Sequence, residues 1–299
     1  MRIFVTGATG WIGSAVTGEL LAAGHDVVGL ARSDASAEAL AARGATPLRG
    51  TLDDLGIIKD AAADSDGVVH LGFVHDFDRF AESGRVERSV VGTIGDTLAG
   101  SDRPFLFAAG VAGLAPGRLA TEDDASQHVG PDAPRGGSEA LGLEYAEQGV
   151  RTVSLRFAAS VHGIGDHGFV AELTRVARER GAAAYVGDGA NRWPAVHRSD
   201  AARLVALALE QAPAGGVVHA VAEEGVAMLD IAEAIGRSLD VPARSVAPEE
   251  AAEHFGWISR FVALDAPASS ALTRARYGWT PTGPTLLEDI AAGGYLPRA

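Results

Sequence analysis

Short apolar runs alternate with longer amphipathic stretches through the first half of the chain. Residues 2–7 form a run rich in β-branched and aromatic side chains, and residues 14–24 then show helical spacing that ends at Gly24. A second apolar run follows at 25–31. Because a helix returns the chain to its starting edge, the pattern predicts two parallel strands joined by a helix.

The alternation continues over most of the first 160 residues. Segments long enough for crossover helices separate the next strands, so the pattern predicts an α/β fold, a doubly wound parallel sheet with helices on both faces. The further candidate strands are 46–50, 67–73, 103–110 and 151–160.

The spacing changes after about residue 160, where loops, helices and short strands follow without a regular alternation. This change predicts a smaller domain that covers the carboxyl edge of the sheet as a substrate-binding cap. We expect the larger domain to span 1–160 and to be rejoined by about 196–222, with the cap formed by 161–195 and 223–299.

A glycine-rich turn joins the first strand to the first helix. Gly7, Gly10 and Gly13 are spaced G-x-x-G-x-x-G, which permits a tight turn and close approach of a pyrophosphate to the positive end of the helix. We therefore predict dinucleotide binding here; the alternative is a tight turn without a ligand. The predicted cofactor contacts lie in this turn and at the ends of two later strands: Gly7, Thr9, Gly10, Trp11, Ile12, Gly13, Leu71 and Ala108.

The end of the second strand suggests which dinucleotide is bound. An NAD site places a carboxylate there to bind the ribose hydroxyls, whereas this chain has Arg32 and Ser33. Both side chains can bind a 2′-phosphate, so we predict NADP(H) in preference to NAD(H). Asp34 is expected to cap the following helix, and the alternative for Arg32 is a solvated loop residue.

Composition excludes several classes of chemistry. The 299 residues include no cysteine, so disulfides, thiolate catalysis and zinc–thiolate sites are excluded, and the single lysine, Lys59, lies in a polar helical segment. A net charge of −14 argues against a nucleic-acid partner. No apolar run is long enough for a membrane span, and no secretion signal is visible, so we expect a cytoplasmic protein with a small-molecule substrate. The oligomeric state stays open.

Several motifs in the same order resemble the extended short-chain dehydrogenase/reductase family, which includes NAD(P)-dependent epimerases and 3β-hydroxysteroid dehydrogenase-like reductases. The resemblance spans nearly the whole chain and implies a Rossmann domain with a small C-terminal domain enclosing the substrate. The matching segments are TGATGWIG at 6–13, 68–73, Leu155-Arg156 with 161–163, the G-D-G segment at 187–210 and the L-x-x-x-x-Y-G-W-x-P element at 272–282.

The catalytic set of that family is missing. The resemblance implies a Tyr-x-x-x-Lys pair, in which tyrosine exchanges a proton, but Arg135 and Glu139 occupy those positions, four residues apart as in an ion pair on a helix. Arginine cannot release a proton at neutral pH. The position of the family's serine or threonine falls in 108–111, which contains no hydroxyl.

Other polar residues follow the strands whose ends meet at the same sheet edge. His162 and His75 are the candidate proton donors, with His162 preferred, while His197 and Asp200 are expected to cap a helix. The irregular spacing of the histidines argues against a metal. The candidate substrate-pocket residues are Val111, Arg135, Asp166, His167, Arg192 and Trp193.

These patterns favour an NADP(H)-dependent oxidoreductase that acts on a small organic substrate through an unconventional proton donor. Loss of the tyrosine and lysine leaves a second hypothesis, a non-redox cyclase, lyase or isomerase on the same scaffold. A third is a dinucleotide-binding sensor without turnover.

Overall fold

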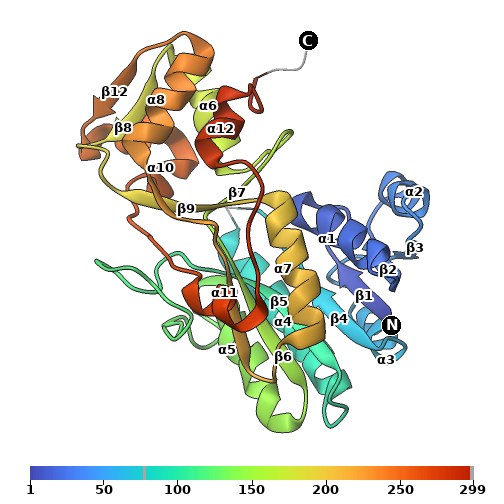
Figure 1. Ribbon diagram of the computed structural model, residues 1–299. Helices are drawn as coiled ribbons and strands as arrows, with labels where there is room; N and C mark the ends of the chain where they lie inside the picture. The colour runs from blue at the N-terminus through green and yellow to red at the C-terminus, as the bar shows by residue number, and fades with distance from the viewer. Residues whose placement is uncertain (77–78, 297–299) are drawn as a thin grey trace.

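The larger domain of the computed structural model, which describes residues 1–76 and 79–296, is built on a seven-stranded sheet. Its strands are β1 (Arg2–Thr6), β2 (Asp26–Ala31), β3 (Thr46–Arg49), β4 (Gly67–His70), β5 (Pro104–Gly110), β6 (Arg151–Phe157) and β10 (Gly216–Ala220). Their order across the sheet is β3-β2-β1-β4-β5-β6-β10, and every neighbouring pair is parallel (Figure 1). The predicted doubly wound sheet is confirmed.

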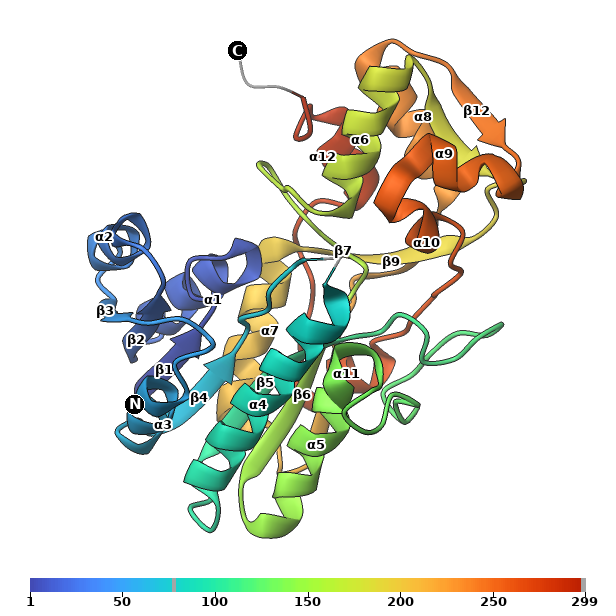
Figure 2. The same cartoon turned by 180° about the vertical axis from the view of Figure 1, so that it is seen from behind.

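Helices cover both faces of this sheet, because alternate side chains of its strands point to opposite faces. Ile3 and Val5 pack with the helices of one face, whereas Phe4 packs with those of the other. Figures 1 and 2 show the helices on the two faces. The first face carries α1 (Trp11–Ala22), α2 (Asp34–Ala42) and α7 (Arg198–Gln211), and the second carries α3 (Leu55–Ala63), α4 (Phe80–Leu98), η1 (Pro134–Gly137), α5 (Ser138–Glu144) and η2 (Tyr145–Gln148).

The strand order reverses between β1 and β4. From β1 the chain builds outward through β2 and β3, then returns to place β4 on the other side, with Thr6 opposite His70. In open α/β sheets a ligand binds outside the carboxyl ends of the strands at such a reversal. The fold therefore puts the glycine turn at the expected binding edge.

A smaller domain lies beyond this edge (Figure 1). Its apolar core includes Trp193, Met228 and Ile231, and the last two lie on one face of α8 at helical spacing. The β7–β9–β11 sheet leads from the larger domain into it. Its elements are β7 (Ser160–His162), α6 (Phe169–Arg180), β8 (Ala183–Val186), β9 (Arg192–His197), β11 (Glu223–Ala227), α8 (Met228–Leu239), β12 (Ala243–Val246), η3 (Pro248–Glu250), α9 (Ala251–Phe255), η4 (Gly256–Ile258), α10 (Ser259–Val262) and α12 (Leu286–Ala291).

One part of the predicted cap boundary is wrong. The helix α11 (Ala271–Tyr277) lies against α7 and β10, and Tyr277 and Trp279 join the core of the larger domain. Trp279 donates its indole N–H to the carbonyl of Asp200 at 3.0 Å. The C-terminal segment therefore returns to the larger domain before α12 packs on the cap, because its aromatic residues bury their surface there.

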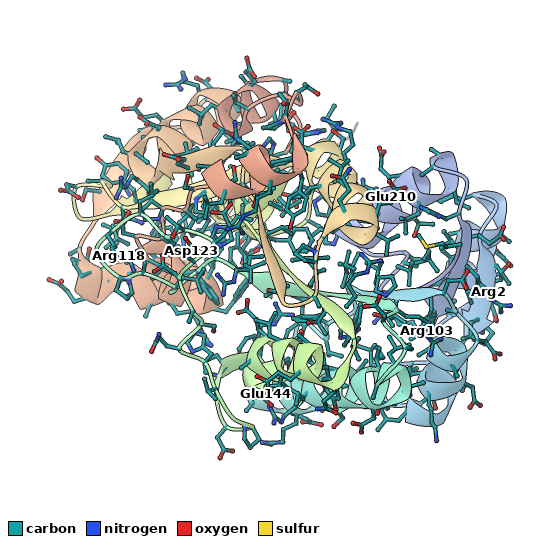
Figure 3. All side chains as sticks on the ribbon, turned by 60° about the horizontal axis from the view of Figure 1, so that its bottom comes forward. Arg2, Arg103, Arg118, Asp123, Glu144 and Glu210 are labelled. Atoms are coloured by element: carbon teal, nitrogen blue, oxygen red, sulfur yellow. The ribbon has the colours of Figure 1, made fainter. Side chains whose placement is uncertain are left out.

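A long loop at 111–133 extends from the carboxyl end of β5 (Figure 2). Figure 3 labels Arg118 and Asp123 on it, beside the C-terminal part of the chain. The carboxylate of Asp123 lies 3.9 Å from the guanidinium of Arg276, and an isolated β-bridge joins Ala120 to Ala268.

Among the residues that the structure describes, no helix is both long and apolar enough to cross a membrane.

Candidate functional site: the carboxyl edge of the sheet

The glycine turn is closed by contacts that exclude side chains. Gly7 has φ +67°, and a Cβ there would lie 2.7 Å from the amide nitrogen of Gly72 at the end of β4. A Cβ on Gly13 would lie 2.0 Å from the carbonyl oxygen of Gly7. Two of the glycines are therefore required by packing. Gly10 is exposed, and among the described residues a Cβ added to it would meet the carbonyl oxygen of Gly7 at 3.1 Å.

The beginning of α1 suits a negatively charged group. Gly10 is the N-cap residue and supplies no side chain, so the first amide groups, those of Trp11, Ile12 and Gly13, have no cap of that kind. These groups and the helix dipole attract an anion such as a pyrophosphate. The residues present therefore fit a dinucleotide, with Thr9 exposed on the turn and Leu71 and Ala108 half-buried at the ends of β4 and β5.

Trp11 connects the turn to the other domain. Its indole N–H donates to the carbonyl of Val161 at 2.6 Å, and the ring of His167 meets it edge-on at 5.8 Å. The guanidinium of Arg198 lies 4.2 Å from the centre of the indole. Trp11 thus takes part in the contact between domains, a role that its place in the motif did not reveal.

The predicted phosphate-binding pair lies at the end of β2. Arg32 and Ser33 are both exposed there, next to the glycine turn in the parallel register. The Ser33 hydroxyl accepts from the amide of Ser36 at 3.2 Å and is the N-cap of α2. The prediction that Asp34 caps this helix is wrong, because Asp34 is already its first residue.

Arg135 and Glu139, which stand at the family's tyrosine and lysine positions, do not pair with each other. Arg135 precedes α5 in a left-handed conformation, with φ 54°, so the two side chains do not share a helix face. Arg135 pairs with Glu87, while Glu139 accepts from Arg156 and Ser154, each at 2.6 Å. The carboxylate at the lysine position thus neutralises a buried arginine, and no cation stands there in its place.

His70 lies inside the sheet next to the turn. Its Nδ1 is 2.6 Å from the hydroxyl of Thr6, and the side chain is fully buried. Burial, followed by the charge of Arg135, lowers the pKa of His70 from 6.5 to about 3. The folded protein therefore keeps this imidazole neutral at pH values at which the unfolded chain protonates it.

We expect the stability of the protein to decrease in acid partly through His70. Because the unfolded state binds the proton first, this group alone should remove about 2 kcal/mol of unfolding free energy between about pH 6.5 and pH 5. Over the same pH interval, the His70→Asn variant should lose about 2 kcal/mol less unfolding free energy than the wild type, measured by urea titration at each pH. His25→Asn, at the opposite edge of the sheet, is the control; an unchanged slope in His70→Asn would contradict the assignment.

The two candidate proton donors lie in different environments. His75 lies beside Phe73, with ring centres 5.1 Å apart, and one side of the residue is open to solvent. Partial desolvation of the imidazole by the protein atoms around it, followed by the charge of Arg135, lowers its pKa. His162 is fully buried, and its Nδ1 lies 2.6 Å from Asp289 on α12. His162 is closed off from solvent in this arrangement, so the proposal below takes His75 as the proton donor.

The predicted pocket residues are only partly brought together. Asp166 and His167 lie in the loop between β7 and α6 of the smaller domain, where Asp166 accepts from the Tyr295 hydroxyl at 3.0 Å. Burial raises the pKa of Asp166. Trp193 belongs to the cap core with 1% exposure and cannot cover a substrate, because the cap's own side chains surround it.

The remaining candidate residues lie in separate surroundings. Arg192 is exposed and pairs with Asp265 at 3.1 Å, at the start of β9. Val111 is buried and lines a cavity of about 100 Å³ between the 111–120 loop and residues 264–267. His197 caps α7 as predicted, but Asp200 instead accepts from the amides of 282 and 283 at 2.9 and 2.8 Å.

Two residues of the site were not predicted. Phe73 lies beneath the Arg135 guanidinium at 4.6 Å, and Glu87 accepts two hydrogen bonds from it. Glu87 stands on the apolar face of α4 with Val90, Val91 and Ile94, all buried. The sequence did carry a signal for Glu87: a single carboxylate falls at helical spacing among apolar residues. Such a carboxylate is expected to be buried, and a buried charge requires a partner of opposite charge.

Comparison with known proteins gives relatives for nearly the whole chain. An uncharacterized protein of Schizosaccharomyces pombe is 49% identical over 297 residues, covering 99% of this chain and 100% of that protein. The 4-hydroxy-2-methyl-3-oxo-4-farnesyl-3,4-dihydroquinoline-1-oxide ketoreductase of Stigmatella aurantiaca is 29% identical over 227 residues, covering 73% and 67%.

The fold is similar to that of solved nucleotide-sugar enzymes. The structure of Thermus thermophilus UDP-glucose 4-epimerase in complex with NAD superposes with a TM-score of 0.76 at 20% identity, covering 99% of both chains. The model of the NAD dependent epimerase/dehydratase family matches residues 3–221, which include the glycine turn, the whole β1–β6 region and α7. The chain therefore belongs to the NAD dependent epimerase/dehydratase family, within the extended short-chain dehydrogenases/reductases.

Proposed function

We propose that this protein is an NADP(H)-dependent oxidoreductase that interconverts a carbonyl group and an alcohol on a small organic molecule. The observation that carries the proposal is the uncapped beginning of α1 behind the glycine turn, with Arg135 and His75 at the neighbouring end of β4. The similarity to a ketoreductase supports carbonyl chemistry.

Each part of this edge has a role in the proposal. The amides of Trp11 and Ile12 hold the pyrophosphate, while Leu71 and Ala108 flank the dinucleotide. The bound nicotinamide supplies or accepts the hydride. Because the family's tyrosine is absent, His75 donates the proton to the substrate oxygen.

Arg32 accounts for the proposed preference for NADP(H). A guanidinium at the end of β2 gives charge-assisted hydrogen bonds to a 2′-phosphate, and Arg32 stands where an NAD site has a carboxylate. We expect NADPH to bind at least about tenfold tighter than NADH, and Arg32→Ala to abolish the difference. Calorimetric titration of both dinucleotides measures this; Arg49→Ala, on the neighbouring strand, is the control. Equal affinities in the wild type would contradict the preference.

His75 gives the activity test. Because its pKa lies below 6.5, a small fraction is protonated at neutral pH, and carbonyl reduction should speed up as pH decreases from about 7 to about 5.5. His75→Phe should lower turnover about 10²-fold and remove this pH dependence.

The measurement is NADPH oxidation with a panel of neutral aldehydes and ketones. His25→Phe is the control, since His25 precedes β2 at the far edge of the sheet. If His75→Phe turns over within threefold of the wild type, His75 is not the proton donor, and water supplies the proton. No turnover by the wild type on any carbonyl would contradict the proposed reaction.

A further inference from the structure

The turn that carries Arg135 has an unusual backbone. Three consecutive residues are left-handed: Arg135 with φ 54°, Gly136 with φ 63° and Gly137 with φ 60°. The glycines adopt this conformation without cost, but for an arginine it is strained by about 1 kcal/mol or more. Such strain persists only where the surroundings impose it, and it occurs most often at functional sites.

The surroundings hold both the backbone and the guanidinium. Gly84 of α4 allows close approach, since a Cβ there would lie 2.7 Å from the amide nitrogen of Gly136. Arg88 donates to the carbonyl of Gly136 at 2.9 Å. Glu87, with 2% exposure, accepts from Nε of Arg135 at 2.9 Å and from its Nη2. Gly84 and Arg88 thus hold the backbone of the turn, and Glu87 holds the guanidinium.

The fixed guanidinium lies at the dinucleotide edge. It rests on the Phe73 ring, three residues beyond β4, and its charge adds to the effect of desolvation in lowering the pKa values of His70 and His75. Glu87 occupies two of its five N–H donors. Within 1–76 and 79–296, no acceptor is bonded to the other three, although the side chain is about one-third exposed.

The buried carboxylate also sets the charge of the site. Because Glu87 and Arg135 form a pair, the remaining donors have little net charge to offer a second carboxylate. They are suited to the dipole of a neutral carbonyl, and to the negative charge that develops on its oxygen during reduction.

We propose that Arg135 donates hydrogen bonds to the carbonyl oxygen of a neutral aldehyde or ketone and stabilises the alkoxide that forms, with Glu87 as the positioning residue. This inference rests on the proposed function. Hydride from the reduced nicotinamide adds to the carbonyl carbon, the π electron pair moves to oxygen, and a proton from His75 or water completes the alcohol. Arg135 itself transfers no proton.

The test uses two probes of equal shape, isobutyramide, a neutral carbonyl compound, and isobutyrate, a carboxylate. Ligand-observed NMR measures their binding to the full chain with and without NADPH. We expect the wild type to bind isobutyramide more tightly than isobutyrate, and Arg135→Lys to weaken isobutyramide binding at least about tenfold, because lysine lacks the planar fork. Arg85→Lys, on the exposed face of α4, is the control and should change isobutyramide binding less than about twofold.

Glu87→Gln provides a second variant that keeps the side-chain volume. Removing the carboxylate leaves the guanidinium charge unbalanced, so the preference should shift at least about tenfold toward isobutyrate. No isobutyramide binding by the wild type, or binding that depends on neither Arg135 nor Glu87, overturns the inference. Failure of NADPH to bind overturns the proposed function separately, because both probes are also measured without the cofactor.

Discussion

Replacing Gly10 with valine should abolish dinucleotide binding and leave the protein folded. The backbone of Gly10, with φ −70° and ψ 179°, is extended, a conformation that valine adopts readily. A Cβ would meet only the Gly7 oxygen at 3.1 Å, but the branched side chain would occupy the space at the beginning of α1 where a pyrophosphate must approach. We expect the Kd for NADPH to increase at least about 100-fold.

Calorimetry and thermal stabilisation by NADPH measure the effect. Gly18→Val is a matched control, because it places the same side chain on α1 at a position where the added Cβ would meet no described atom beyond its own helix within 4 Å. Gly13→Val is unsuitable, since its Cβ would clash with Gly7 and unfold the turn. A folded Gly10→Val protein that binds NADPH within threefold of wild type would place the phosphate site elsewhere.

Replacing Asp200 with alanine should lower the free energy of unfolding by about 3–5 kcal/mol. Asp200 is buried with 1% exposure, and its two oxygens accept from the amides of Thr282 and Gly283 and from Arg203. Removing it takes the shared acceptor from three donors and frees the segment that leads to α12. Urea unfolding measures the change.

Asp60→Ala on the exposed face of α3 is the control and should change stability by less than about 0.5 kcal/mol. Asp200→Asn keeps one acceptor oxygen, so its loss of unfolding free energy should lie between those of Asp60→Ala and Asp200→Ala. An Asp200→Ala protein as stable as the control would show that the C-terminal segment is held by its apolar contacts alone.

The fold was largely predictable from the sequence. The strands from β1 to β6 and the helix α1 were expected from spacing, because hydrophobic periodicity and terminating glycines act over a few residues. The return of α11 to the larger domain was not expected. No local pattern states which of two apolar surfaces will cover Tyr277 and Trp279.

The candidate site was predictable where chemistry follows the local backbone. Gly7 and Gly13 are required because the turn closes on itself and on the end of β4. Arg32 and Ser33 lie where the strand ends, and only the assignment of the helix cap changed. The absence of a Tyr-x-x-x-Lys pair was likewise readable from the printed residues.

The sequence by itself determined the parallel sheet, the glycine turn and the missing tyrosine, since each depends on residues that are neighbours in the chain. Only the tertiary structure decided the surroundings of individual side chains. Arg135 meets a carboxylate 48 positions away, and His162 one 127 positions away, so burial and charge changed their roles. Local spacing determines the element and the face on which a side chain stands. The groups that set its protonation state and its exposure to solvent come from other elements that pack against it.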